Sequence, residues 1–451
     1  MRYKFTHNLA LLILSGCLIN AASNTSVFAQ SDLPNQSRIK NFGWSLKQFE
    51  NKESKDKKAK KANKSSDTNN DDNSQPASPN NSNTSENRIS ENNKTENNKN
   101  ERVGEDTVCV ETNLVINDVL VVNDKARAVT NLQPKDFIIT EDGTEQKPEM
   151  FSFGDSVRRS IVLIINNRRL YAKQHKKSVT AAQRLIDKLT PQDKMAIVTT
   201  EIKLVLDFTS DKQLLKKTLT DITPLGKKIV GEDRDYGTLM AVLDEMFDEK
   251  DVRPIVIFMT NGEEAFGLKK DKDELPFTDR MRQTFAGYGG ERGYGFSDVM
   301  ERIKKSRATI YSIFPWIRFV GLPKEEQLKI VHVWTVDLQR QLGTENSPFT
   351  NTKANRKMEI EQVNNVIWLQ MAMMQAAKLS GGYAEFLAKP EDAEKVYDTI
   401  FAVINNRYTI GYYSTNENKG GKERTVKIQV RGHTEYTILT RENYLPLTRE
   451  K

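Results

Sequence analysis

Blocks of apolar residues alternate with amphipathic stretches through the middle of the chain. Residues 161–165 are five apolar residues in a row, IVLII, which indicates a short strand that is buried on both faces. The stretch 173–189 then repeats apolar residues at helical spacing, and MAIVTT at 195–200 is predicted to be the next strand. The same alternation predicts further helices near 211–221, 238–249 and 391–405, and further strands at 203–208, 255–260, 308–314 and 383–386.

Buried strands that alternate with helices are joined by right-handed crossovers, which makes the strands parallel. We therefore predict an α/β domain over 158–406 with a doubly wound, mostly parallel sheet. Within it, 315–380 is long for a connection and is predicted to hold packed helices. Glu359 and Glu361 interrupt its apolar residues, which argues against a membrane span.

Single apolar and polar residues alternate in the segments on either side of this domain. The N-terminal segment, 107–157, contains VCVETNLVINDVLVV and DFIITEDGTEQKPEMFSF, with turn signals at NDKAR and EDGT. The C-terminal segment, 407–451, holds the runs RYTIGYYS, RTVKIQVR and EYTILT, and NENKGGKE is predicted to be a hairpin turn. Both segments are predicted to be antiparallel β structure. The pattern allows either one shared β-sandwich or two separate pieces.

The first 29 residues are predicted to be an export signal. Arg2 and Lys4 precede a short apolar core at 9–14, which is too short to span a bilayer permanently. Cleavage after Ala29 fits the small-residue rule, whereas LSGC resembles a bacterial lipobox in which Cys17 is lipidated. Either way we predict an exported protein that is periplasmic, on the cell surface or secreted. It attaches to a membrane only if Cys17 is lipidated.

The segment between the signal and the first β segment is rich in Lys and Asn. Its Lys-rich part, NKESKDKKAKKANK, is followed by a long Asn/Ser/Glu tract that has almost no apolar residues. Such a composition offers too little apolar surface to offset the entropy of ordering the chain. Residues 30–106 are therefore predicted to be a disordered linker.

Charge and composition exclude several classes of function. The net charge of +7, from 68 basic and 61 acidic residues, is small for 451 residues, so no nucleic-acid partner is predicted. Cys17 and Cys109 are the only cysteines, so the mature chain has no intramolecular disulfide. The four histidines lack a metal-binding spacing, and neither a GxSxG elbow nor a GxxxxGK[ST] loop is present. We predict that the chain is not an enzyme, and an extracytoplasmic enzyme is the least favoured alternative.

Three polar loops follow the predicted strands at the edge where open parallel sheets bind their ligands. They are INNRRL at 165–170, DYGTLMAV at 235–242 and MTNGEE at 259–264. The three loops come from different parts of the sequence, and we expect them to meet at one edge of the sheet.

Segments in the same order resemble the VWFA-related family common in acidobacterial genomes, which is built on a von Willebrand factor type A domain. The resemblance extends from about residue 107 to about residue 445. The segments are LQPKDFIITEDGTEQKPEMFSF, LVLDFTSDKQLL, YGTLMAVLDEM, ATIYSIF, LSGGYAEF, INNRYTIGYYSTNENKGGKERTVKIQV and TRENY.

The resemblance implies a metal-ion-dependent adhesion site, which in this family uses DxSxS, a Thr on the second loop and an Asp on the third. This chain departs from that pattern. Asn166 replaces the first Asp, Arg168 and Leu170 replace the two Ser residues, Thr238 is kept, and Asn261 replaces the last Asp. An amide oxygen is a weaker Mg²⁺ ligand than a carboxylate, and a nearby guanidinium opposes a dication. We predict a degenerate site with no bound metal and no cofactor.

Two hypotheses for this site stay open. In the first, the site has decayed and the domain is a scaffold that uses other contact surfaces. In the second, Arg168 or Arg169 supplies the positive charge and receives an acidic side chain of a protein partner. The predicted function is thus an exported, non-enzymatic protein-binding or scaffold protein. The alternative is a Mg²⁺-dependent adhesion module that uses Asp235, Glu263 or Glu264 in a rearranged site.

Overall fold

The computed structural model describes most of the chain beyond the predicted export signal. Several predicted features lie outside the described residues: the signal itself with Cys17, Cys109, most of the linker, and Glu263 and Glu264. The described residues are 36–52, 114–154, 157–167, 172–222, 234–248, 253–262, 268, 293–315, 317–343, 353–389, 392–416 and 421–446.

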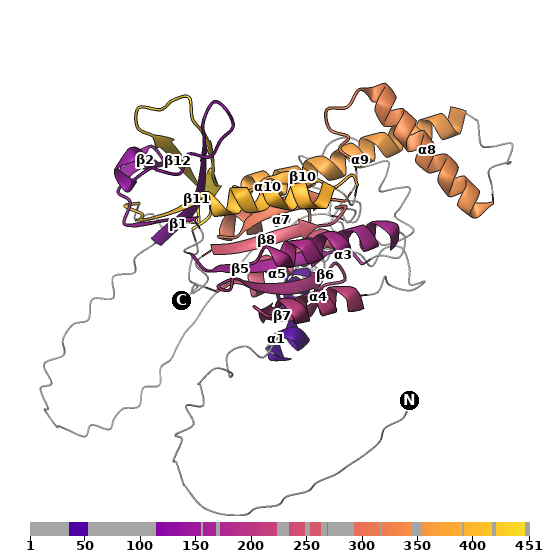
Figure 1. Ribbon diagram of the computed structural model, residues 1–451, viewed down its shortest axis with the longest axis horizontal. Coiled ribbons are helices and arrows are strands. Elements are labelled where there is room, and N and C mark those ends of the chain that lie inside the picture. The colour runs from indigo at the N-terminus through magenta and orange to yellow at the C-terminus, as the bar shows by residue number, and fades with distance from the viewer. Residues whose placement is uncertain are drawn as a thin grey trace, which may run out of the picture. The chain divides into compact units, whose positions relative to one another are not determined.

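A six-stranded sheet forms the centre of the α/β domain (Figure 1). Its strand order is β10-β9-β8-β5-β6-β7, and every neighbouring pair is parallel except β6 and β7. This is the doubly wound, mostly parallel sheet that the sequence predicted. The strands are β5 (Arg159–Ile165), β6 (Lys194–Thr199), β7 (Lys203–Thr209), β8 (Arg253–Met259), β9 (Thr309–Phe314) and β10 (Ala384–Phe386).

Alternate residues of β5 point into two different helical layers, because successive side chains of a strand face opposite sides of the sheet. Val162 and Ile164 pack with α5, α7 and α9, whereas Ile161, Leu163 and Ile165 pack with α3, α4 and α10. Both faces are therefore covered, which explains the continuous apolar run. The helices are α3 (Ala172–Asp187), α4 (Lys212–Asp221), α5 (Asp235–Glu245), α7 (Phe296–Lys305), α9 (Lys353–Leu379) and α10 (Ala393–Asn405).

The long helix α9 packs within the protein, as predicted for 315–380. Its C-terminal part joins the sheet core through Leu369 and Met373, and its N-terminal part packs on α8 (Lys324–Leu342) through Val363 and Val366. None of the described helices combines the length and the apolarity needed to cross a membrane.

The flanking β segments form one β-sandwich. Val119, Phe137, Tyr408 and Ile428 come from four strands in two different sheets and belong to one apolar core. The first sheet, in the order β13-β1-β11-β4, and the second, in the order β14-β12-β2-β3, each combine N-terminal and C-terminal strands. The strands are β1 (Leu114–Val122), β2 (Phe137–Glu141), β3 (Thr144–Gln146), β4 (Met150–Phe153), β11 (Arg407–Tyr413), β12 (Arg424–Val430), β13 (Thr437–Leu439) and β14 (Asn443–Tyr444).

The prediction of a hairpin between the first two C-terminal strands is wrong. β11 pairs with β1 and β4, while β12 pairs with β2 and β14 in the other sheet. The buried faces of the two strands, Ile410 on β11 and Ile428 on β12 among them, meet across the sandwich core. Long-range pairing with the N-terminal strands has thus displaced the local pairing that the turn composition suggested.

Residues 36–52, which the sequence assigned to the disordered linker, are helical. α1 (Gln36–Asn41) is followed by a second helical stretch at 44–52. Phe42 and Leu46 are buried in the sheet core, and Ile39 and Phe49 pack against it. For this stretch the linker prediction is wrong, because apolar residues three or four positions apart give it a face that the domain buries.

Candidate functional site

Asn166 and Asn261, two residues of the predicted degenerate site, lie next to each other. β5 and β8 are neighbours in the sheet, so the residues that follow them leave the same edge side by side. Asn166 Nδ2 donates to Asn261 Oδ1 at 3.3 Å, and the Asn166 backbone N–H donates to Met259 O at 3.3 Å. The helices that follow these strands, α3 and α7, belong to opposite layers. The asparagines therefore mark the point where the strand order reverses, which is where such sheets bind ligands.

The first turn of α5 is fastened to the loop that follows β8. Asp235 and Thr238 are fully buried on this helix. Asp235 Oδ2 accepts a hydrogen bond from the Gly262 N–H at 2.9 Å, one residue beyond Asn261. Asp235, which the sequence suggested only as a weak substitute ligand, is thus a buried carboxylate at the centre of the loops.

Four buried polar atoms around this edge have no hydrogen-bond partner within the described part of the chain. They are Asn167 Oδ1, Thr200 Oγ1, Thr238 Oγ1 and Asn261 Nδ2. Buried polar atoms are nearly always hydrogen-bonded, and the exceptions are frequent at functional sites. They lie just after β5, β6 and β8 and on the first turn of α5, so this edge has unused hydrogen-bonding capacity.

His175 on α3 holds the loop that follows β5. Its Nδ1 lies 2.8 Å from Asn166 O, and its Nε2 lies 3.0 Å from Ile222 O beyond α4. The side chain is buried. The sequence gave no sign of this contact. Asn166 lies only 9 residues before His175, but Ile222 lies 47 residues after it, and the tertiary fold brings the three together.

A carboxylate, that of Glu201, contacts the loop after β5, whereas the guanidinium of Arg234 contacts residues outside that loop. Glu201 Oε1 accepts from Asn167 Nδ2 at 3.5 Å and from Thr199 Oγ1 at 3.4 Å. Arg234, one residue before Asp235, directs its guanidinium toward Tyr294 Oη and Glu50 rather than toward the asparagines. Among the described residues, no group of three or more His, Cys, Asp or Glu side chains is arranged to hold a metal ion.

Three predicted site residues, Arg168, Arg169 and Leu170, lie outside the described residues. The structure therefore brings together Asn166, Asn261 and the helix that carries Thr238, and the role of the two arginines stays a prediction. The lipidation of Cys17 stays a prediction for the same reason.

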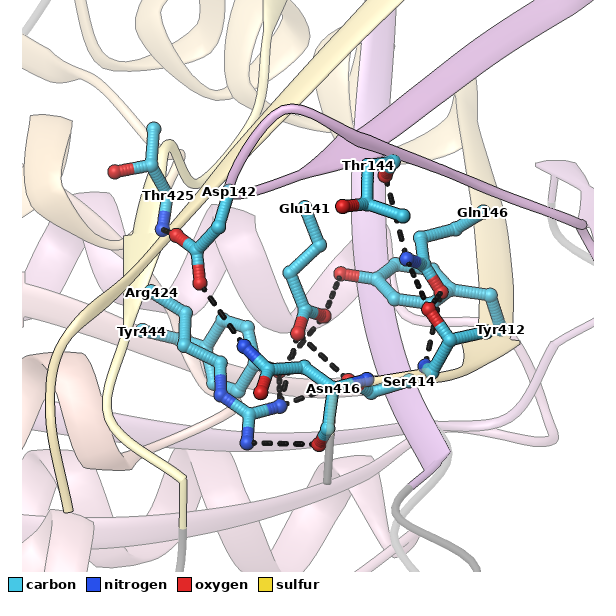
Figure 2. Close-up of polar contacts among 11 residues, drawn as sticks. Glu141, Asp142, Thr144, Gln146, Tyr412, Ser414, Asn416, Arg424, Thr425 and Tyr444 are labelled. Atoms are coloured by element: carbon cyan, nitrogen blue, oxygen red, sulfur yellow. Dashed lines mark hydrogen bonds and ion pairs between the residues drawn. The ribbon is translucent and has the colours of Figure 1, made fainter. Parts of the chain in front are cut away.

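A second polar cluster lies inside the β-sandwich (Figure 2). The Glu141 carboxylate on β2 accepts from Tyr412 Oη at 2.9 Å, Ser414 Oγ at 2.6 Å, Arg424 Nη1 at 2.8 Å and Tyr444 Oη at 3.0 Å. Glu141 and Arg424 are buried, so this charge pair is shielded from solvent. Because its donors come from both sheets, the cluster joins the sheets to each other and is structural.

The same cluster shifts the titration of its tyrosines. Burial raises the pKa of Tyr444 to about 12, and the nearby Glu141 carboxylate adds to the effect. Burial also raises the pKa of Tyr412 far above its usual value, again with a contribution from Glu141. Both phenols therefore stay protonated and act as donors at neutral pH.

No protein-family model and no curated protein matches the chain. Among solved structures, an aerotolerance-related membrane protein from Bacteroides fragilis NCTC 9343 is 14% identical over 55% of this chain and 98% of that chain, with a TM-score of 0.31. The vWF domain of the type V pili tip protein Mfa5 from Porphyromonas gingivalis is 13% identical over 55% and 95%, with a TM-score of 0.33.

A longer Mfa5 structure of three N-terminal domains is 17% identical over 34% of this chain, with a TM-score of 0.21, and this chain spans 26% of its length. At these identities and TM-scores the likenesses carry no argument about function. The type A-like α/β fold is defined by the strand order and by the two helical layers described above.

Proposed function

We propose that this chain is an exported, non-enzymatic protein-binding module whose type A-like site works without a metal ion. The observation that carries the proposal is the hydrogen bond of 3.3 Å between Asn166 Nδ2 and Asn261 Oδ1. In the related adhesion site these two positions are carboxylates on either side of a cation. Here two neutral amides contact each other directly, and neither brings the negative charge that a cation requires.

The side-chain oxygens that the described residues offer at this edge fit Mg²⁺ poorly as ligands. Mg²⁺ requires oxygen ligands in near-octahedral geometry, and protein carboxylates supply most of the charge. Asp235 is the buried carboxylate beside these loops, and one of its oxygens already accepts the Gly262 N–H. The amide of Asn166 turns its nitrogen, not its oxygen, toward Asn261. This arrangement favours a partner that hydrogen-bonds to amides and hydroxyls.

For the partner we propose a protein that presents an acidic side chain. Arg168 and Arg169 directly follow Asn167 in the sequence, on the loop that leaves this edge. A guanidinium binds a carboxylate through two parallel hydrogen bonds, which replaces the bridging role of the metal. The alternative within the same class is a scaffold in which the edge is inactive and other surfaces make the contacts.

One observation favours a second function, a Mg²⁺-dependent adhesion module. The buried Asp235 carboxylate accepts a hydrogen bond from Gly262, the residue that follows Asn261. Thr238, which matches the threonine of the family's site, has no hydrogen-bond partner for its Oγ1 within the described residues. A cation bound there would use ligands in a rearranged order.

Thermal unfolding of the full chain in EDTA, Mg²⁺ or Mn²⁺ separates the two functions. A ligand at 100 times its Kd stabilises the folded state by about 2.7 kcal/mol. We expect the same melting temperature in all three solutions. A saturable rise with Mg²⁺ would instead establish the adhesion module.

Binding to an acidic peptide tests the role of the arginines. The probe is a surface-immobilised library of short peptides that each carry one Glu, with Gln at that position in the matched library. Arg168→Ala with Arg169→Ala should lose the preference for Glu. The control is the double variant Lys125→Ala with Arg127→Ala, which removes the same charge from exposed positions on the sandwich. This control should keep the preference for Glu peptides. If both double variants show the same preference for Glu over Gln peptides, the arginines do not bind the partner. The scaffold, in which other surfaces make the contacts, would then be the function.

A further inference from the structure

The helical segment 36–52, which we call the clasp, packs along α5. Phe42 and Leu46 are buried in the core that contains Leu239, Met240 and Leu243 of α5. Phe49 lies under the Arg302 guanidinium of α7, with the Arg302 Cζ 4.7 Å from its ring centroid. The clasp is therefore seated by a small apolar face and by contacts to two neighbouring helices.

Polar contacts fix the clasp at both ends of α5. At the C-terminal end, the Glu245 carboxylate accepts from the Gly43 N–H at 2.8 Å, from the Ser45 N–H at 2.8 Å and from Ser45 Oγ at 2.5 Å. At the N-terminal end, Glu50 forms an ion pair with Arg234, the residue that precedes the helix. The helical part of the clasp thus runs antiparallel to α5 and holds it at both ends.

The Glu50–Arg234 ion pair is connected to the candidate site through a short series of hydrogen bonds. The backbone of Arg234 donates to Thr200 O at 2.9 Å and accepts from the Thr238 N–H at 2.6 Å. The next residue, Asp235, holds the Gly262 N–H of the Asn261 loop at 2.9 Å. Hydrogen bonds thus connect Arg234 to Thr238 on one side and, through Asp235, to the Asn261 loop on the other.

Two features of the clasp favour its reversible release from α5: the long stretch of sequence that follows it and its small buried apolar face. Between Lys52 and Leu114 lie 61 residues (114 − 52 − 1), so the clasp can leave its seat without drawing on β1. Its seat involves few buried apolar residues, which is typical of segments that open locally at low free-energy cost. On its other side, the predicted export signal with Cys17 precedes the clasp in the sequence, so a pull from an anchor at Cys17, if that residue is lipidated, would reach the clasp before the sheet.

We propose that the clasp regulates the candidate site. When seated, it fixes Arg234 through Glu50 and holds the first turn of α5 and the Asn261 loop in the described arrangement. When the clasp is released, Arg234 loses its ion pair with Glu50 and keeps its contact with Tyr294, and the first turn of α5 and the loop after β8 become more mobile. This inference rests on the proposed function, in which that edge binds the partner.

Hydrogen–deuterium exchange of the full chain tests the coupling without a ligand. The amides to follow are those in 234–243 and 259–262, because the Thr238 and Gly262 N–H groups both make hydrogen bonds in these peptides. Glu50→Gln removes the charge that holds Arg234 and keeps the shape of the side chain. We expect exchange of these two peptides to rise at least tenfold, while the peptides of β5 and β8 stay protected.

The matched control is Arg38→Ala, which removes the clasp's ion pair of 3.2 Å with Asp207 on β7 and leaves the Glu50 contact in place. It should not change exchange in 234–243 or 259–262. A stronger variant, Leu46→Ala, releases the clasp from its apolar seat and should reproduce the effect of Glu50→Gln. If neither Glu50→Gln nor Leu46→Ala raises exchange at these peptides, the clasp is only a packing element and the proposal is overturned.

The outcomes separate this inference from the proposed function. Faster exchange without any preference for Glu peptides would retain the coupling and reject the acidic partner. A preference for Glu peptides that depends on Arg168 and Arg169, with exchange unchanged by Glu50→Gln, would retain the partner and reject the regulation.

Discussion

Arg253, the first residue of β8, directs its Nε to Asp118 Oδ1 on β1 at 3.2 Å, and so joins the central sheet to the β-sandwich. Its other nitrogens donate to Thr409 Oγ1 at 2.6 Å and to the carbonyls of Gly154, Ile404 and Arg407. The Arg253 side chain is almost fully buried, and the Asp118 side chain is nearly so. The buried Arg253 guanidinium is thus one of the connections between the sandwich and the α/β domain.

Arg253→Ala should destabilise the whole chain by about 3–5 kcal/mol, because it leaves Asp118 buried without its counter-charge. Chemical denaturation measures this loss. The control is Arg340→Ala, which removes an exposed pair with Asp337 at 2.8 Å and should cost no more than about 0.5 kcal/mol. A loss below about 1 kcal/mol for Arg253→Ala would show that the junction carries little of the stability.

Exchanging the two asparagines for aspartates should create a dependence on metal. In the double variant Asn166→Asp with Asn261→Asp, two carboxylates replace two amides whose atoms lie 3.3 Å apart. Their repulsion should lower the melting temperature in EDTA, and Mg²⁺ should restore it by binding between them. The wild-type chain is the control, with no expected response. A double variant that does not respond to Mg²⁺ would mean that these positions do not face a common cation site.

Gly262→Ala should weaken the loop that Asp235 holds. Gly262 has a φ of +70°, and a Cβ there would lie 3.2 Å from Met373 Cγ. The backbone conformation alone should cost about 1–2 kcal/mol. Gly432→Ala is the matched control, because Gly432 has a φ of +77° and open space around the added Cβ. Equal losses of unfolding free energy in the two variants would show that only the backbone conformation matters.

Stability should fall at high pH through the tyrosines of the sandwich. The pKa of Tyr444 is raised to about 12 by burial, above its value of about 10 in the unfolded chain. The folded state therefore binds more protons than the unfolded state between about pH 10 and pH 12. The stabilisation is complete below pH 10 and is lost as the pH rises through 12. Denaturation curves from pH 8 to pH 12 measure it.

Tyr444→Phe is the control for this pH dependence. It should flatten the fall in unfolding free energy between pH 10 and pH 12, since phenylalanine has no proton to lose. A variant with the same alkaline decline as the wild type would assign that decline to other groups.

Much of the fold could be predicted from the sequence, because the burial of each strand is visible in its own residues. The run 161–165 is apolar throughout, and β5 is buried along its whole length. The β12 strand alternates, and only every second residue is buried. These patterns depend on the immediate environment of one element, so they can be seen locally.

The clasp could not be separated from the linker by composition alone. The Lys-rich tract NKESKDKKAKKANK begins at residue 51, within the last residues of the clasp, and dominates any wide window. The spacing of Ile39, Phe42, Leu46 and Phe49 is the signal that could have identified a helix with one apolar face. The pairing partner of β11 was missed for a different reason: NENKGGKE is suited to a turn, and nothing local shows that the next strand joins another sheet.

By itself, the sequence determined the class of the fold and the amides at positions 166 and 261, because both depend on which residue types occur in which order. The tertiary structure alone decided that the amides of Asn166 and Asn261 bond to each other, that Asp235 holds the Gly262 N–H, and that Glu50 reaches Arg234. Each of these contacts joins residues that are far apart in the chain. Hydrogen bonds and ion pairs depend on distances of a few ångströms, which are set only when the helices and strands pack together.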